Sequence, residues 1–237
     1  MMRRVLVAGL LVAACGGEPF DDVGSFSSDW IGKGVTSTLV TTTTSSTTSL
    51  VSVQATGWAN DSLVVDADEP KKVISEVWKR SDKSSAFVQA SRREVSVAVP
   101  GIQFPALVPN GTFAITSQLV YDRSKATLAK NVVAAFGLWN VKPYSKSRAA
   151  GQIGVLEVAN AKEAEELECE DLLVGGALDC VPMTVKDTKG WYLGNEVGNT
   201  LVWFSDGLRY ELFLRQPWES SHALQMAESV EPLAGLE

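Results

Sequence analysis

The alternation of apolar and polar residues is clearest near the end of the chain. A hairpin is predicted there, because Ser205-Asp206-Gly207 separates the segments TLVWF and LRYELFL, and an Asp-Gly pair favours the positive φ of a tight turn. One face of the second strand is apolar throughout, with Leu208, Tyr210, Leu212 and Leu214. A final helix is expected after a cap at Ser220 or Ser221, with apolar residues at helical spacing: Ala223, Met226, Ala227 and Val230.

Upstream segments predict one more helix and several strands. Acidic residues before Pro70 suit a helix start, and this helix is expected to end near Arg80. Its apolar face is made by Val73, Ile74, Val77 and Trp78. A strand is predicted over residues 95–99, where valines alternate with polar or small residues. Further strand candidates are TFAITSQLVY, NVVAAFGLW, GQIGVLEV, VPMTV and GWYLG.

Residues 100–111, PGIQFPALVPNG, are predicted to form an extended connection and not a central strand, because proline has no N–H for a ladder. A short acidic helix is expected over residues 161–168, since Asn160 and Glu163 form a capping-box-like start. Strands and helices segregate along the chain. The expected fold class is therefore α+β, a mostly antiparallel sheet with a few short packing helices, after a signal peptide and a flexible Ser/Thr-rich tether.

The first fourteen residues have the three parts of a secretory signal: two arginines, an apolar stretch, and small residues before a cut. The apolar stretch is too short for a transmembrane helix. Val12-Ala13-Ala14-Cys15 resembles the lipobox of bacterial lipoproteins. This resemblance implies that Cys15 receives a diacylglycerol and becomes the first residue of the mature protein. The protein would then be exported and held by lipid on the outer face of the cytoplasmic membrane, or on an outer membrane.

A tether is expected over residues 15–54, because the polar stretch after Cys15 leads into an unbroken run of hydroxyl residues at 41–49 that has no apolar side chains to bury. The alternative is that threonine's β-propensity draws residues 35–40 and 50–53 into edge strands. A single α+β extracytoplasmic domain is expected over residues 55–237.

Three cysteines are an odd number for an exported protein. If Cys15 carries lipid, Cys169 and Cys180 remain as a pair in an oxidising compartment, and a disulfide between them is favoured over two free thiols. A tetrahedral metal site is not expected, because no histidine lies near the two cysteines.

The C-terminal segment contains the run VKDTKGWYLGN, followed by NTLVWFSDGLRYELF and HALQMAESVEPL. These motifs resemble the end of a small domain family of unknown function. That family occurs in extracytoplasmic bacterial proteins, including the outer parts of some membrane-bound anti-sigma factors. The resemblance covers about 45 residues and implies a related fold but no activity. Regulation of transcription is not implied, because this chain has no sigma-binding region or spanning helix before the domain.

Charge and composition exclude several classes of function. The formal net charge is −7, which disfavours a nucleic-acid partner because such a surface repels phosphates. The chain has one histidine, His222, expected as an exposed helix residue, so a zinc enzyme is not expected. No nucleophile elbow or phosphate-binding glycine loop is present. The acidic residues near position 166 are interpreted as a solvated helix face in preference to a cation site. No cofactor or catalytic residue is predicted.

Aromatic residues are the remaining candidates for a binding site. A pocket for an apolar or sugar ligand is one hypothesis for Trp139, Tyr144, Trp191, Tyr192 and Trp203. Core packing is the alternative, since large aromatic side chains supply much of any core's buried area.

The sequence therefore predicts a non-catalytic, membrane-anchored extracytoplasmic lipoprotein that binds or senses an envelope protein, wall polymer or other envelope component. The alternative is a carrier or binding protein for a lipid or another apolar ligand, with a cavity under the sheet. An enzyme that uses carboxylates on an envelope polymer is the third and least favoured hypothesis.

Overall fold

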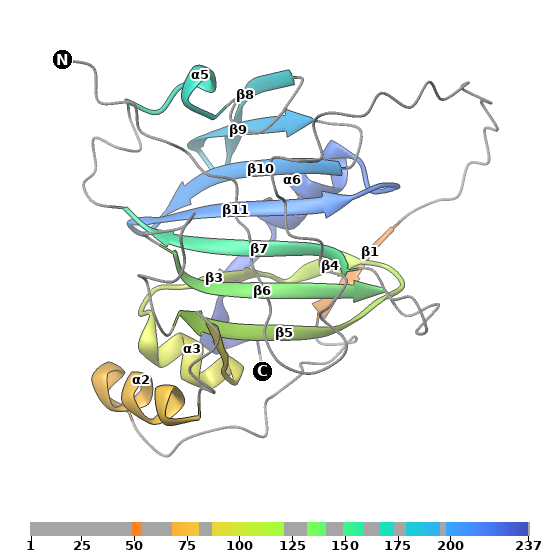
Figure 1. The fold of residues 1–237 in the computed structure, drawn as a ribbon. Coiled ribbons are helices and arrows are strands. Elements are labelled where there is room, and N and C mark those ends of the chain that lie inside the picture. Colours follow the sequence, from red (N-terminus) through yellow and green to blue (C-terminus); the bar gives the residue numbers. More distant parts are fainter. Residues whose placement is uncertain are drawn as a thin grey trace, which may run out of the picture.

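The computed structural model describes residues 49–53, 68–80, 87–120, 132–140, 149–158, 166–172, 179–194 and 198–236. An eight-stranded sheet dominates the fold, with strand order β2-β5-β6-β7-β11-β10-β9-β8 and every neighbouring pair antiparallel (Figure 1). The strands are β2 (Phe87–Gln89), β5 (Thr112–Val120), β6 (Val132–Asn140), β7 (Ala149–Glu157), β8 (Asp179–Val185), β9 (Thr188–Gly194), β10 (Gly198–Ser205) and β11 (Leu208–Arg215). The expected α+β class with a mostly antiparallel sheet is confirmed.

Four helices and two small ladders accompany the sheet in the described part of the chain. The helices are α2 (Pro70–Lys79), α3 (Arg92–Ala98), α5 (Cys169–Leu172) and α6 (Ser220–Glu228), with a 3₁₀ turn, η4 (Leu233–Gly235). The ladders pair β1 (Leu50–Ser52) with β4 (Leu107–Pro109), and β3 (Gln103–Pro105) with β12 (Val230–Pro232). Figure 1 shows α2 and α3 beside the β5 end of the sheet and α5 beside β8 at the other end.

The proline-rich connection behaves as expected from its missing N–H groups. Residues 100–111 supply two three-residue strands, β3 and β4, and neither belongs to the large sheet. The strand β1 lies inside the segment predicted as tether, so residues 50–52 follow the alternative of an edge strand. Residues 35–40, and Cys15 itself, lie outside the described residues.

The hairpin at the chain's end is confirmed. Asp206 and Gly207 both have positive φ, 50° and 73°, which is the backbone that the Asp-Gly pair suits. The β10 and β11 strands pair from Gly198↔Arg215 to Ser205↔Leu208. The predicted helix ending near Arg80 is also confirmed, as α2.

The strand predicted over residues 95–99 is wrong, because α3 covers most of it. The sequence signal was Ser91, whose hydroxyl accepts a hydrogen bond from the Glu94 N–H, while the Glu94 carboxylate accepts one from the Ser91 N–H. This capping box satisfies two N–H groups at the helix start and favours helix over strand.

Two details of the last helix also differ from the prediction. The N-cap of α6 is Glu219, and Ser220 and Ser221 lie inside the helix. The helix ends at Glu228, and Val230 lies in β12, where it pairs with Pro105. The helix stops because the chain joins the β3 ladder, a tertiary pairing that helical spacing does not reveal.

The two faces of the sheet are built differently. The helical face, named here for the helices that cover it, carries the apolar residues of β11 (Leu208, Tyr210, Leu212 and Leu214), and α3, α6 and η4 contribute to its core. Two aromatic pairs fill this core: Phe104 meets Phe136 edge-on at 4.9 Å, and Trp203 stacks on Tyr210 at 5.0 Å between ring centroids.

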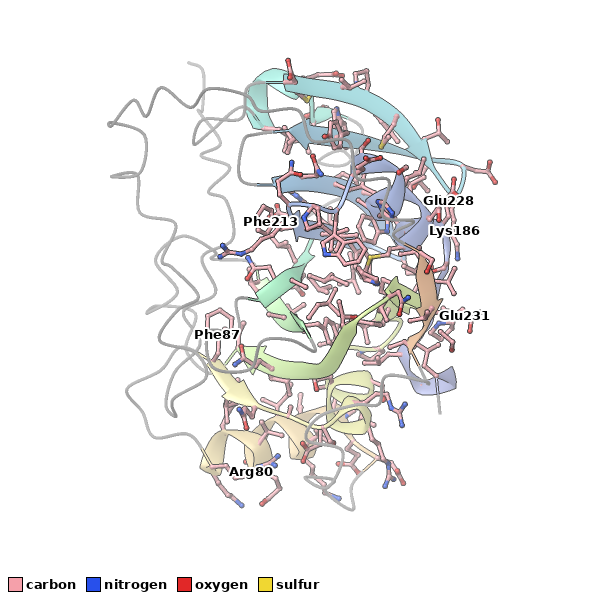
Figure 2. The ribbon with its side chains drawn as sticks, turned by 90° about the vertical axis from the view of Figure 1, so that its right-hand side faces the viewer. Arg80, Phe87, Lys186, Phe213, Glu228 and Glu231 are labelled. Carbon is pink, nitrogen blue, oxygen red and sulfur yellow. A yellow bond between two sulfur atoms is a disulfide. The ribbon has the colours of Figure 1, made fainter. Side chains whose placement is uncertain are left out.

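The opposite face carries the other residues of β11, Arg209, Glu211 and Phe213. Figure 2 shows Phe213 and Phe87 on one side of the sheet, with Glu228 and Glu231 on the other. Two smaller apolar clusters lie toward the ends of this face. One contains Leu167, Leu172, Trp191, Val202 and Phe204. The other contains Phe87, Val120, Val132 and Ala135.

Candidate binding surface

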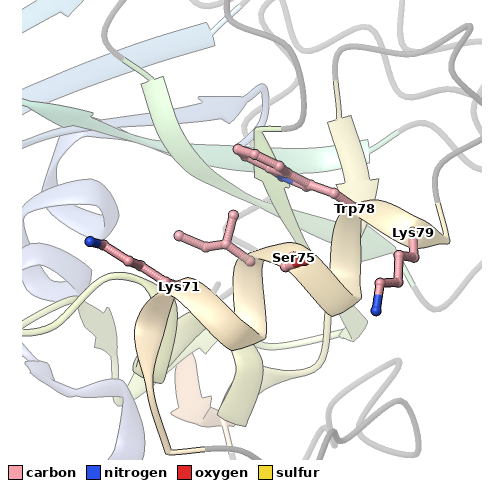
Figure 3. A pocket seen from close by; sticks show the side chains of 5 residues that line it. Lys71, Ser75, Trp78 and Lys79 are labelled. Carbon is pink, nitrogen blue, oxygen red and sulfur yellow. The ribbon is translucent and has the colours of Figure 1, made fainter.

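A groove runs along the outer side of α2 (Figure 3). It is shallow and largely open to solvent, has a volume of about 560 Å³, and its described lining residues are Lys71, Ile74, Ser75, Trp78 and Lys79. These positions recur every three or four residues, so they form one stripe of the helix. Figure 3 shows the Lys71 and Lys79 amines at opposite ends of this stripe, with Trp78 at the Lys79 end and its ring directed away from the Lys79 amine. We call this surface the α2 groove.

The other side of α2 holds the helix against the domain. Val73 and Val77 are fully buried in the core of the helical face. At the end of the helix, the Arg80 guanidinium lies 2.5 Å from the buried carboxylate of Glu94 on α3. Because the inner side is packed and the C-terminal end is tied by an ion pair, the helix presents the groove residues from a fixed position.

Trp78 has an unusual environment for a large aromatic residue in this protein. Its side chain is 38% exposed, while Trp191, Trp203 and Trp218 are buried. The indole Nε1 donates a hydrogen bond to the Val120 carbonyl at 3.1 Å, which fixes one edge of the ring against the sheet. An amphipathic ring that is anchored at its polar atom and keeps part of its apolar surface exposed is suited to contact a partner.

The α2 groove is cationic as well as apolar. Among the residues that the structure describes, the lining includes two lysines and no acidic residue. Lys79 pairs with Glu76 on the same helix. Lys72 lies outside the groove and pairs with Glu69, with Nζ 3.6 Å from Oε1. Both pairs are largely exposed, so they neutralise the surface only weakly.

The aromatic residues predicted to line a pocket do not come together. Trp191 lies on the opposite face, where it meets Phe204 edge-on at 6.0 Å between ring centroids. Trp203 lies on the helical face and stacks on Tyr210. The two tryptophans are on neighbouring strands, but Trp191 is paired with Val202 and Gly190 with Trp203, so their side chains leave the sheet in opposite directions.

Tyr192 and the two remaining candidates add no pocket. The Tyr192 hydroxyl donates to the Asn199 side-chain oxygen. Its partial burial raises the pKa of that hydroxyl. The side chain of Trp139 and the whole of Tyr144 lie outside the described residues. The three described aromatics therefore take part in packing and hydrogen bonding, which is the alternative that the sequence left open.

Cys169 and Cys180 form the expected disulfide, with their Cα atoms 5.6 Å apart. The bridge ties α5 to the edge strand β8 and lies beside the cluster around Trp191. Nearby, the Lys189 amine lies 2.7 Å from a Glu168 carboxylate oxygen and 5.0 Å from the centroid of the Trp191 ring. The disulfide, the Lys189–Glu168 ion pair and the contact of Lys189 with Trp191 thus stabilise the β8–β9 end of the sheet.

The acidic segment before the disulfide is only partly described, since residues 159–165 lie outside the structure's described ranges. Glu166 is exposed, and Glu168 pairs with Lys189. Among the residues that the structure describes, no group of three histidine, cysteine, aspartate or glutamate side chains is placed to hold a metal ion.

His222 is not the exposed helix residue that the sequence predicted. It is buried, its Nδ1 accepts a hydrogen bond from the Glu219 N–H at 3.1 Å, and its ring meets Trp218 edge-on at 5.5 Å. The imidazole takes the place that glutamate takes in an ordinary capping box, so its role is to fix the start of α6.

A buried ion pair on the opposite face escaped the sequence reasoning. Arg209 and Glu211 bond to each other through Nη2 and Oε1, and their side chains are only 7% and 8% exposed. The Arg209 Nε has no hydrogen-bond partner. Burial raises the pKa of Glu211, although the Arg209 charge opposes this shift. The sequence signal for this ion pair was the presence of two opposite charges, two residues apart on the same strand face, in the otherwise apolar run LRYELFL.

The surroundings of this pair explain how it is accommodated. Across the β11–β7 ladder, Arg209 faces Leu156 and Glu211 faces Gly154. On the next strand, β6, the residue paired with Gly154 is also small, Ala135. Gly154 has no side chain across the ladder from Glu211, and the arrangement is that of a structural ion pair.

None of the helices in the described ranges is long and apolar enough to cross a membrane. Comparisons with protein-family models, with curated proteins and with solved structures find no match to this chain.

Proposed function

We propose that the protein is a membrane-anchored extracytoplasmic lipoprotein without catalytic activity, which binds an envelope component through the α2 groove. The lipobox-like sequence around Cys15 supports the anchor. The binding role is supported by one observation above all: Trp78 keeps 38% of its surface exposed on the same helix as Lys71 and Lys79, in a domain whose other described tryptophans are buried.

The energetics of Trp78 favour a binding role. Exposed apolar surface on a tryptophan forgoes the stabilisation that burial would give, which is about 25 cal/mol for each Å². The helix has a well-packed inner side, so Trp78 is not required there to complete a core. A large aromatic residue in a fixed position is also the type of side chain that contributes most to protein and ligand interfaces.

The carrier hypothesis is less well supported by the described residues. A carrier for an apolar molecule needs a cavity, usually of several hundred Å³ and mostly enclosed. Beneath the helical face, aromatic and aliphatic side chains are in direct contact, as in the Phe104–Phe136 pair. The enzyme hypothesis calls for two carboxylates that face each other, whereas the Glu211 carboxylate faces the Arg209 guanidinium.

The anchor is tested by changing Cys15. Cells that express the full chain are supplied with an alkyne-bearing fatty acid, and label on the protein is measured after fractionation. We expect the unchanged chain to be labelled and to sediment with membranes, and Cys15→Ala to carry no label. Label that persists on Cys15→Ala contradicts the lipoprotein assignment.

The binding surface is tested by placing a photoreactive amino acid at Ser75, within the α2 groove. Gln225, an exposed residue of α6, is the matched control position on another helix. We expect cross-linking to an envelope lipid, polymer or protein from position 75 and little from position 225. Equal cross-linking from both positions contradicts a specific role for the groove.

A further inference from the structure

We infer that the α2 groove docks onto an anionic lipid surface, the headgroup layer of the membrane to which the chain is anchored. This inference rests on the proposed function, because the lipid on Cys15 is what brings the domain close to that surface. It goes further by naming which side of the domain faces the membrane and which chemistry holds it there.

The charge distribution supplies the first argument. The whole chain has a net charge of −7, so most of its surface is repelled by anionic headgroups. The α2 groove departs from this balance, since its charged lining residues are both lysines. Each lysine near an anionic bilayer contributes about 1 kcal/mol of attraction. The groove is therefore a part of the described surface that an anionic headgroup layer attracts.

The side-chain chemistry supplies the second argument. Tryptophan is favoured at the level of lipid headgroups, where its ring is apolar and its edge is polar. Lysine extends an apolar stem along such a surface while its amine stays among the phosphates. In the α2 groove, Ile74 and Trp78 supply the apolar area, and Lys71 and Lys79 stand at its two ends. This is the arrangement of residues found on helices that lie in an interface.

The position of the anchor supplies the third argument. Cys15 precedes the first described residue, Ser49, by a polar segment rich in serine and threonine. The lipid proposed on Cys15 would keep the domain near the bilayer without choosing its orientation. The orientation is then decided by the surface of the domain, and a weak cationic and aromatic contact is sufficient because the anchor makes it an intramolecular event.

The test uses the full chain, purified with its lipid and reconstituted into vesicles. One set of vesicles contains phosphatidylcholine alone, and the other contains phosphatidylcholine mixed with phosphatidylglycerol. An amine-reactive acetylating reagent labels the lysines, and mass spectrometry gives the rate at each position. Lys72 is the internal reference, because it neighbours Lys71 on the same helix but lies outside the groove.

We expect phosphatidylglycerol to slow the labelling of Lys71 relative to Lys72 by about fivefold, in line with the attraction of one lysine to an anionic surface. Quenching of tryptophan fluorescence by brominated phosphatidylglycerol provides a second readout. It should be strong in the unchanged chain and much reduced in Trp78→Phe. An unchanged ratio of Lys71 to Lys72 labelling, together with equal quenching of the two chains, overturns the inference.

Charge reversal gives a matched pair of variants. Lys71→Glu should abolish the quenching of tryptophan fluorescence by brominated phosphatidylglycerol, while Lys72→Glu should retain most of it. Equal losses in the two variants indicate a general charge effect and contradict docking through the groove. Protection of Lys71 in intact cell envelopes but not in anionic vesicles assigns the groove to a protein or polymer and also overturns the lipid assignment.

The mass of the N-terminal peptide separates the two proposals. A chain that carries no lipid contradicts the proposed function as well as the docking that depends on it. A lipidated chain that shows no protection of Lys71 contradicts the docking alone and leaves the anchor in place.

Discussion

The two faces of the sheet use the same strands but are stabilised in different ways. On the helical face, β11 contributes Leu208, Tyr210, Leu212 and Leu214 to one continuous core covered by helices. On the opposite face, the same strand contributes the Arg209–Glu211 ion pair, with separate apolar clusters toward the ends of the sheet. The β11 residues in the continuous core carry no charge, whereas the opposite side of the same strand accepts a charged pair whose members satisfy each other.

The largest effect is expected in the continuous core. Trp203→Ala removes a fully buried ring that stacks on Tyr210, and we expect the free energy of unfolding to fall by about 4 kcal/mol. Trp191→Ala, the matched change on the opposite face, should cost about 3 kcal/mol because the smaller cluster around it can partly collapse. Denaturant unfolding measures both. Equal losses, or a larger loss for Trp191→Ala, break the proposed contrast between the faces.

The ion pair comes next in size. Glu211→Ala leaves the buried Arg209 guanidinium without its carboxylate, and we expect a loss of about 3 kcal/mol in the free energy of unfolding. The double variant Arg209→Met with Glu211→Leu removes both charges and should regain most of this stability. If the double variant is as unstable as Glu211→Ala, the pair is needed for more than mutual neutralisation.

The pair also predicts a pH dependence. Burial raises the pKa of Glu211 above its ordinary value of 4.5, so the native state keeps this proton over a pH range where the unfolded chain has lost it. The contribution of Glu211 to the free energy of unfolding should therefore fall as pH rises from about 4.5 through the raised pKa. Glu211→Gln does not titrate and should flatten the profile in this range. An unaltered profile in Glu211→Gln contradicts the raised pKa.

The disulfide tests the end of the opposite face. Replacement of Cys169 and Cys180 by serine should lower the free energy of unfolding by about 2–3 kcal/mol, because the bridge restricts the unfolded chain. Hydrogen exchange should rise most in α5 and β8 and least in β11, which lies in the middle of the sheet. A uniform rise across the sheet contradicts a local role.

The smallest effect is expected at the start of α3, a helix of the helical face. Ser91→Ala removes the hydroxyl that accepts the Glu94 N–H at 3.2 Å, and it should cost about 1 kcal/mol in the free energy of unfolding. Ser221→Ala is the control, because Glu219 caps α6, and its effect should stay within about 0.5 kcal/mol. Thermal unfolding compares the two variants, and a larger loss for Ser221→Ala reverses the assignment of the caps.

Local chemistry explains which elements the sequence predicted correctly. The Asp206-Gly207 turn and the helix after Pro70 depend on backbone preferences of a few neighbouring residues, and both are found where expected. The segment over residues 95–99 was wrongly predicted because its valines alternate as they would in a strand. Ser91 and Glu94 decide in favour of the helix, and they precede the valines.

The candidate site was less predictable from the sequence. Trp191 and Trp203 were grouped as pocket residues, but the strand register sends them to opposite faces. Trp78 was assigned to the apolar face of its helix together with Val73 and Val77, yet it lies toward the groove and keeps much of its ring exposed. The reason is that Val73 and Val77 alone fill the contact with the domain, which depends on neighbours far away in the sequence.

The sequence by itself determined the α+β class and the final hairpin from local preferences, and it favoured the pairing of Cys169 with Cys180 because the assignment of Cys15 to lipid left these two cysteines. Only the tertiary structure decided which side chains are buried and which are exposed. Arg209, Glu211 and His222 are buried, and Trp78 is partly exposed. Burial depends on which segments pack against a residue, and those contacts join positions that no local pattern connects.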